Sequence, residues 1–228
     1  MGINKIYLYW ACNELSLIDR AIDISGYLKS IASFLPVAKL KIADGKKGKE
    51  VKMESSSETV SIILEQIKRE IRKHYKEKDI PDDFTEKVSS RVSFRSEGLS
   101  FRIAIGGCQE NASNNIIIEG RNLHLLDVPE LFKTSINYFK PDWGVITQID
   151  YIEEELGQTI DEYWFGWMTY FSKTIRLPEI PQNIITEELS TGGKLLITSH
   201  EPFNPQIIEH SNKAKALVTA FRKAGMFR

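Results

Sequence analysis

Only a few residues in this 228-residue sequence have the types and spacing that could support metal or acid–base chemistry, and the histidines come first. The four histidines are His74, His124, His200 and His210. His200-Glu201 is followed at once by Pro202, so the second histidine that a helical zinc site needs four residues after the first is missing. The sequence therefore predicts no metal site and no cofactor.

A nucleophilic residue is the second possibility. Gly106-Gly107-Cys108 could form a nucleophile turn, but no histidine motif accompanies it, and a glycine pair that ends a strand is the simpler interpretation. Phosphate-binding loops, dinucleotide fingerprints and Gly-x-Ser-x-Gly elbows are absent from the sequence. We therefore predict no catalytic residue. A small cytosolic enzyme of unrecognised family stays open as the alternative, because folding can assemble an acid–base pair that one sequence does not reveal.

The segment from Asp150 to Glu162 is the most acidic part of the chain. It holds six carboxylates and no Lys or Arg. Concentrated like charge costs self-repulsion, and in a nearly neutral chain it gives the electric field a direction. Aromatic residues beside such charges often carry interface energy. The predicted partner-binding residues are Asp150, Tyr151, Glu153, Glu154, Glu155, Asp161, Glu162 and Trp164. A solvated acidic helix start or loop, with Tyr151 and Trp164 in the core, is the alternative.

A predicted helix from Ser57 onward carries the opposite charge on one face. Its basic residues are Lys68, Arg69, Arg72, Lys73, Lys76 and Lys78. Glu65, Glu70 and Glu77 are interspersed among them, which favours a solvated face over a nucleic-acid site. This face is the next candidate surface for an acidic partner.

Composition narrows the class of protein. A formal net charge of −1 argues against nucleic-acid binding through a global positive field. Cys12 and Cys108 are too few for a disulfide framework or a zinc cluster, and we expect idle thiols. Residues 1–12 lack the pattern of a signal peptide, and no stretch approaches the ~18 apolar residues of a membrane span. We expect a cytoplasmic protein that binds neither membranes nor nucleic acid.

The hydrophobic pattern predicts the elements that position these residues. We expect strands at 6–10, 92–95, 99–107, 115–119, 143–147, 166–171 and 194–198, and a hairpin within 37–53. Helices are expected at 17–35, with a weak point at Gly26, after Ser57, after Asp127, and from Asn204-Pro205 to Gly225. Trp167, Tyr170, Leu195 and Ile197 are the predicted core residues of the last strands.

These elements favour a single α+β domain over residues 1–228. A largely antiparallel sheet would be covered by about four helices, and the face of the C-terminal helix from Ile207 to Phe221 would pack on the sheet.

The last quarter of the sequence holds a series of short motifs: residues 166–172 (GWMTYFS), Leu177-Pro178, residues 192–197 (GGKLLI), residues 201–205 (EPFNP), and His210 followed by residues 214–217 (AKAL). With these motifs it resembles the immunity protein 52 family of bacterial polymorphic-toxin immunity proteins, and related type VI secretion immunity families share a similar Gly-Trp-Thr-aromatic strand. The resemblance implies a protein that neutralises a cognate toxin by direct binding. Such toxins are often nucleases with a restriction-endonuclease-like fold. Their basic substrate grooves would complement the acidic segment.

Overall fold

The structure is a computed structural model that describes residues 4–11, 14–36, 39–42, 48–54, 56–75, 80–84, 90–107 and 114–227. The side chains of residues 39 and 73–75 are not described. The chain divides into two compact units, residues 9–139 and residues 1–8 with 140–228. That the chain is one domain stays a prediction.

The sheet of the first unit confirms the predicted hairpin and the strands predicted at 92–95, 99–107 and 115–119, which form a meander. Its strands are β2 (Lys39–Ile42), β3 (Glu50–Lys52), β4 (Ser90–Ser96), β5 (Leu99–Ile105) and β6 (Asn114–Glu119), in the spatial order β3-β2-β4-β5-β6. All four pairings in this series are antiparallel. The strands alternate between buried and more exposed residues, the period-2 pattern of a sheet with one covered face.

Helix α1 (Leu17–Ser30) begins where Ser16 accepts a hydrogen bond from the Asp19 N–H. It runs unbroken through Gly26, so the predicted weak point there is wrong. A Cβ at Gly26 would lie 2.3 Å from the Tyr138 hydroxyl, which itself donates to the Asp23 carbonyl. Glycine is therefore needed for close packing at this position. The chain leaves the helix after Ser30 and continues as the short helix η1 (Ala32–Phe34).

The fully buried Arg20 ties α1 to the sheet, a role that the sequence did not reveal. Its Nε donates to the Leu15 carbonyl at 3.0 Å, Nη1 to the Ser90 hydroxyl at 2.7 Å, and Nη2 to the Gly106 carbonyl at 2.9 Å. Gly106 has a φ of +82°, and a Cβ there would collide with the guanidinium. The glycine pair therefore ends β5 as predicted, and it also makes room for this arginine.

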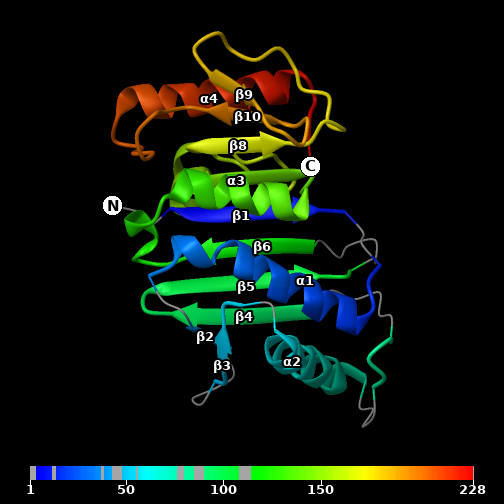
Figure 1. Ribbon diagram of the computed structural model, residues 1–228. Helices are drawn as coiled ribbons and strands as arrows, with labels where there is room; N and C mark the ends of the chain where they lie inside the picture. Colours follow the sequence, from blue (N-terminus) through cyan, green and yellow to red (C-terminus); the bar gives the residue numbers. More distant parts are fainter. Residues whose placement is uncertain are drawn as a thin grey trace. The chain divides into compact units, whose positions relative to one another are not determined.

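The other helices of this unit are α2 (Ser57–Tyr75), α3 (Val128–Phe139) and the short η2 (Leu123–Leu125). Figure 1 shows α1 crossing β5 and β4, and α2 beside β4, on which it packs. Helix α3 contacts α1 through a buried hydrogen bond between the hydroxyls of Tyr27 and Ser135, 2.8 Å apart. Burial raises the pKa of Tyr27, which keeps this phenol neutral.

The second unit holds β1 (Lys5–Trp10), of which residues 5–8 belong here, with β7 (Trp143–Thr147), β8 (Met168–Phe171), β9 (Ile185–Glu188) and β10 (Lys194–Ile197). Their order is β1-β7-β8-β10-β9, and β7, β8, β10 and β9 pair antiparallel. Strand β9 was not predicted, because Ile185–Glu188 reads as a mixed polar run. It is an edge strand, where charged residues are common.

The predicted core of these strands is largely confirmed. Trp167, Tyr170 and Leu195 are buried, but Ile197 is only half-buried and Leu196 lies in the core instead. Leu195 and Leu196 point to opposite faces of β10 and are both fully buried, so both faces of the sheet are covered there, whereas Ile197 ends the strand.

Helix α4 (Ile208–Lys223) confirms the predicted C-terminal helix with a corrected start. The side chain of Asn204 accepts from the Gln206 N–H, which closes a turn before the helix, so α4 begins three residues after Pro205. Ile207 and Ile208 are consequently exposed, and the packed face starts at His210. The helix ends in a Schellman motif at Gly225, with the Met226 N–H donating to the Phe221 carbonyl.

Phe221 docks α4 on β8. The centroid of its ring lies 5.2 Å from that of Phe171 and 4.7 Å from that of Phe165, and the ring of Tyr163 completes the cluster. An α+β fold with antiparallel strand pairing and a C-terminal helix packed on its sheet is therefore confirmed, and the described residues form four α-helices.

We predict that Phe221→Ala lowers the free energy of unfolding by ~3–5 kcal/mol, because it leaves a cavity among closely packed aromatic rings. Phe227→Ala is the matched control, since Phe227 is 56% exposed and should change stability little. Chemical denaturation of both variants provides the measurement. Equal stability of the two would mean that Phe221 does not dock the helix.

Candidate functional site

After β7, the acidic segment begins with a single turn of π-helix, η3 (Tyr151–Glu155). The Leu156 N–H donates to the Tyr151 carbonyl at 3.1 Å, five residues earlier, which widens the turn. This turn places Tyr151 and Ile152 inside the protein and the next three carboxylates outside.

Tyr151 lies in the core, as the alternative interpretation of this segment has it. It is 3% exposed, its ring lies 5.0 Å from that of Phe203, and its hydroxyl lies 3.0 Å from the Ser211 hydroxyl on α4. Burial raises the pKa of Tyr151, and the nearby Glu155 raises it further. This side chain fastens the acidic segment to α4 and offers little area to a partner.

Glu162 is also buried, and it forms the strongest polar contact of the segment. Its carboxylate accepts two hydrogen bonds from Arg222 of α4, at 2.5 and 3.0 Å, and one from the Thr159 N–H at 2.9 Å. Arg222 also donates to the Gly157 carbonyl at 2.9 Å. The hydrogen bond from Arg222 holds the pKa of Glu162 below its ordinary value. We call the loop 157–162 with Arg222 the arginine clip.

Trp164 is half-buried beside the clip. Its indole N–H donates to the Thr159 carbonyl at 3.0 Å, and its ring meets those of Tyr7 and Trp143 edge-on, with centroids 5.4 and 6.2 Å away. These contacts fix the ring, which holds the loop in place.

The exposed part of the predicted surface is therefore smaller than the sequence suggested. The exposed carboxylates are Asp150, Glu153, Glu154, Glu155 and Asp161. Ile160, at the tip of the clip, is 68% exposed and lies next to Asp161 in the chain. Its apolar type within a polar loop was a visible signal that sequence reasoning missed. The role of Arg222 could not be found in this way, because it lies 60 residues away from Glu162.

Ser199 and His210 form the arrangement closest to a nucleophile and its base, with Oγ and Nε2 2.8 Å apart. The Asn204 N–H, which can only donate, points to His210 Nδ1 at 3.2 Å. Neutral His210 must therefore carry its proton on Nε2 and donate it to Ser199. A histidine in this tautomer cannot take a proton from the serine. The pair organises the 199–206 loop, in which Ser199 also accepts from the Glu201 N–H.

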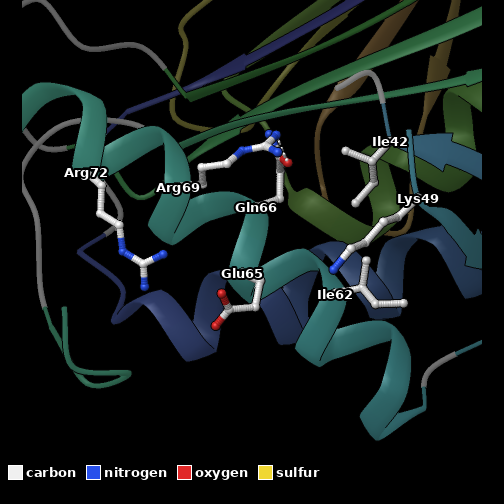
Figure 2. Close-up of a pocket in the computed structure, with 7 residues that line it drawn as sticks. All are labelled: Ile42, Lys49, Ile62, Glu65, Gln66, Arg69 and Arg72. Carbon is white, nitrogen blue, oxygen red and sulfur yellow. Dashed lines mark hydrogen bonds between the residues drawn. The ribbon is translucent and has the colours of Figure 1, made fainter. Parts of the chain in front are cut away.

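The basic helix face is only partly described, since Lys76 and Lys78 and the side chain of Lys73 lie outside the described residues. Lys68 is buried and pairs with Asp82. Next to it, a shallow hollow of about 140 Å³ is lined by Ile42, Lys49, Ile62, Glu65, Gln66, Arg69 and Arg72. Figure 2 shows Arg69 turned toward Gln66, whose amide oxygen it contacts at 2.5 Å, while Arg72 points away from it. The cations of this hollow are spread apart rather than gathered on one point.

Among the described residues, no group of three or more His, Cys, Asp or Glu side chains is placed to hold a metal ion. Cys12 and Cys108 lie outside this part of the chain. No helix in the described ranges is long and apolar enough to cross a membrane.

These observations define the class as an α+β protein whose candidate functional feature is a surface. Residues 122–228 match the family model described as Immunity protein 52, which confirms the resemblance indicated by the C-terminal motifs. Among solved structures, the chain matches the Pseudomonas aeruginosa T6SS protein PA0821 with a TM-score of 0.48 and 11% identity, over 95% of this chain and 74% of that chain. The comparison with curated proteins gives no match.

We predict that Glu162→Gln lowers the free energy of unfolding at neutral pH by about 1–2 kcal/mol, because Arg222 loses its charged acceptor. Since folding lowers the pKa of Glu162 from 4.5, its contribution is complete above that value and is lost as the pH falls through the folded pKa. The difference from the wild type should therefore shrink in acid. Urea denaturation over a pH series measures it.

Glu154→Gln is the control for this prediction, since Glu154 is exposed on the same segment. It should change stability little at any pH. A Glu162→Gln difference that stays constant or grows on acidification would contradict the role of the clip.

Proposed function

We propose that this chain is a bacterial immunity protein that neutralises a cognate toxin in the cytoplasm by binding it directly. The observation that carries the proposal is the family match over residues 122–228, which supports an immunity role. That range includes the acidic segment, the arginine clip and α4. The tautomer of His210 adds support, because it removes the most plausible catalytic pair of the second unit.

The proposed toxin-facing surface consists of the five exposed carboxylates of the segment together with Ile160. A nuclease toxin with a basic substrate groove would present the complementary charge, which speeds association and disfavours other partners. The clip holds the loop in one conformation, so less entropy is lost when the partner binds. Ile160 would supply an apolar contact at the centre of a charged rim.

Co-expression tests the function itself. The gene next to that of this protein is expected to encode the toxin, whose expression alone should stop growth. Co-expression of this chain should restore growth, and the two proteins should purify together. Growth arrest in spite of a folded and abundant chain, with no co-purification, would overturn the proposal.

The triple variant Glu153→Lys, Glu154→Lys and Glu155→Lys tests the surface. We expect association with the toxin to slow by about tenfold or more at low salt and to lose much of its salt dependence, because the steering field is reversed. Association rates at two ionic strengths, with melting curves as a folding check, provide the measurement.

A matched variant, Glu179→Lys with Glu188→Lys and Glu201→Lys, changes the net charge equally at three exposed positions elsewhere in the same unit. It should associate much faster than the variant of the acidic segment. Equal rates for the two triple variants would mean that only net charge matters, and would move the interface away from this segment.

A further inference from the structure

One face of the sheet in the unit of residues 9–139 is covered by helices. The rows that cross the strands on this face are fully buried: Val92, Ile103 and Ile116 in one row, and Phe94, Phe101 and Ile118 in the next. In Figure 1, α1 crosses β5 and β4, and α2 lies beside β4, on which it packs. Because side chains alternate along a strand, the residues between these rows point to the opposite face.

That opposite face is open, and the register of the strands defines it. One row runs from Glu50 of β3 through Lys41, Arg95 and Ser100 to Glu119. The next row joins Ser93, Arg102 and Ile117, and Arg91 lies two residues before Ser93 on β4. Glu50, Lys41, Arg91 and Arg95 are exposed, and the other residues in the two rows are half-buried. We call these residues of β2, β3, β4, β5 and β6 the open face.

The charge on the open face is unbalanced. Arg102 is paired with Glu119 at 2.9 Å. Lys41 stands between Glu50 of β3 and Arg95 of β4, so the facing carboxylate offsets part of its charge. Arg91 and Arg95 form no ion pair with any residue that the structure describes. The described part of this face thus carries four cations, Lys41, Arg91, Arg95 and Arg102, against the two carboxylates Glu50 and Glu119, in a chain whose net charge is −1.

We propose that the open face docks an acidic surface of the partner protein. This inference rests on the proposed function, since the partner is the toxin. Carboxylates of the partner would neutralise Arg91 and Arg95, and the hydroxyls of Ser93 and Ser100 would complete a polar contact. A partner that carries opposite charges at two places, one for the acidic segment and one for the open face, is recognised more specifically than a partner of one sign.

Protein is favoured over nucleic acid because of what the open face lacks. Sheets that bind single strands stack bases on aromatic side chains, and the outward residues of β4, β5 and β6 include none. The two aromatic residues in the middle of these strands, Phe94 and Phe101, are fully buried on the covered face. Glu119 would also repel a phosphate backbone that crossed the row.

The test uses the full chain, the adjacent toxin and the variant Arg91→Glu with Arg95→Glu. At low ionic strength its association with the toxin should be about tenfold slower than that of the wild type, and the salt dependence should change. Lys173→Glu with Arg176→Glu is the matched control, with the same change in net charge at two exposed positions outside the open face. The control should stay within about twofold of the wild type.

Each outcome of this experiment supports or overturns the docking inference. Equal rates for the variant and the control overturn the docking inference and leave the proposed function in place. A wild type that does not bind the toxin overturns both. If the wild type binds an oligothymidine probe and the variant does not, the face binds nucleic acid and the inference is overturned. If the wild type self-associates in sedimentation and the variant does not, the face joins two copies of the chain, which also overturns the inference. If the variant melts early, Arg91→Gln with Arg95→Gln replaces it, with an intermediate rate expected.

Discussion

The second unit depends on one constraint, which is that α4 must bury its apolar side against β8. Phe221 meets this constraint by packing into the rings of Phe165, Phe171 and Tyr163. Aromatic rings bury large areas and prefer tilted and offset contacts, so the cluster fixes both the position and the rotation of the helix. The loop before β8 is fixed with it, because two of the rings come from that loop.

The acidic segment takes its shape from this docking. Once α4 is in place, its polar residues reach the segment at two points, Ser211 at Tyr151 and Arg222 at Glu162. Buried carboxylates are stable only when they are paired, and Glu162 meets this condition through three hydrogen bonds. The wide turn of η3 places Glu153, Glu154 and Glu155 on the surface. The buried residues of the segment thus hold its exposed carboxylates in place, which suits binding to a partner of opposite charge.

The chain is almost neutral as a whole, but its charged residues gather on separate surfaces. The acidic segment concentrates exposed carboxylates in one unit, and the open face concentrates Lys41, Arg91 and Arg95 in the other. Attraction across an interface depends on such local fields and far less on net charge. The two surfaces differ in origin. The acidic one is a contiguous run in the sequence, whereas the basic one is assembled by strand register from residues more than fifty positions apart.

The sequence by itself determined most of the elements, though not β9, and the class of fold, because hydrophobic period and turn residues act locally. It located the meander, the strands around Trp167 and Leu195, the C-terminal helix, and the family motifs. It also located the acidic segment. Tertiary structure alone decided which of those residues face solvent, since Tyr151 and Glu162 are buried by contacts with a helix about 60 residues away. Burial and ion pairing depend on long-range packing, which local sequence patterns do not encode.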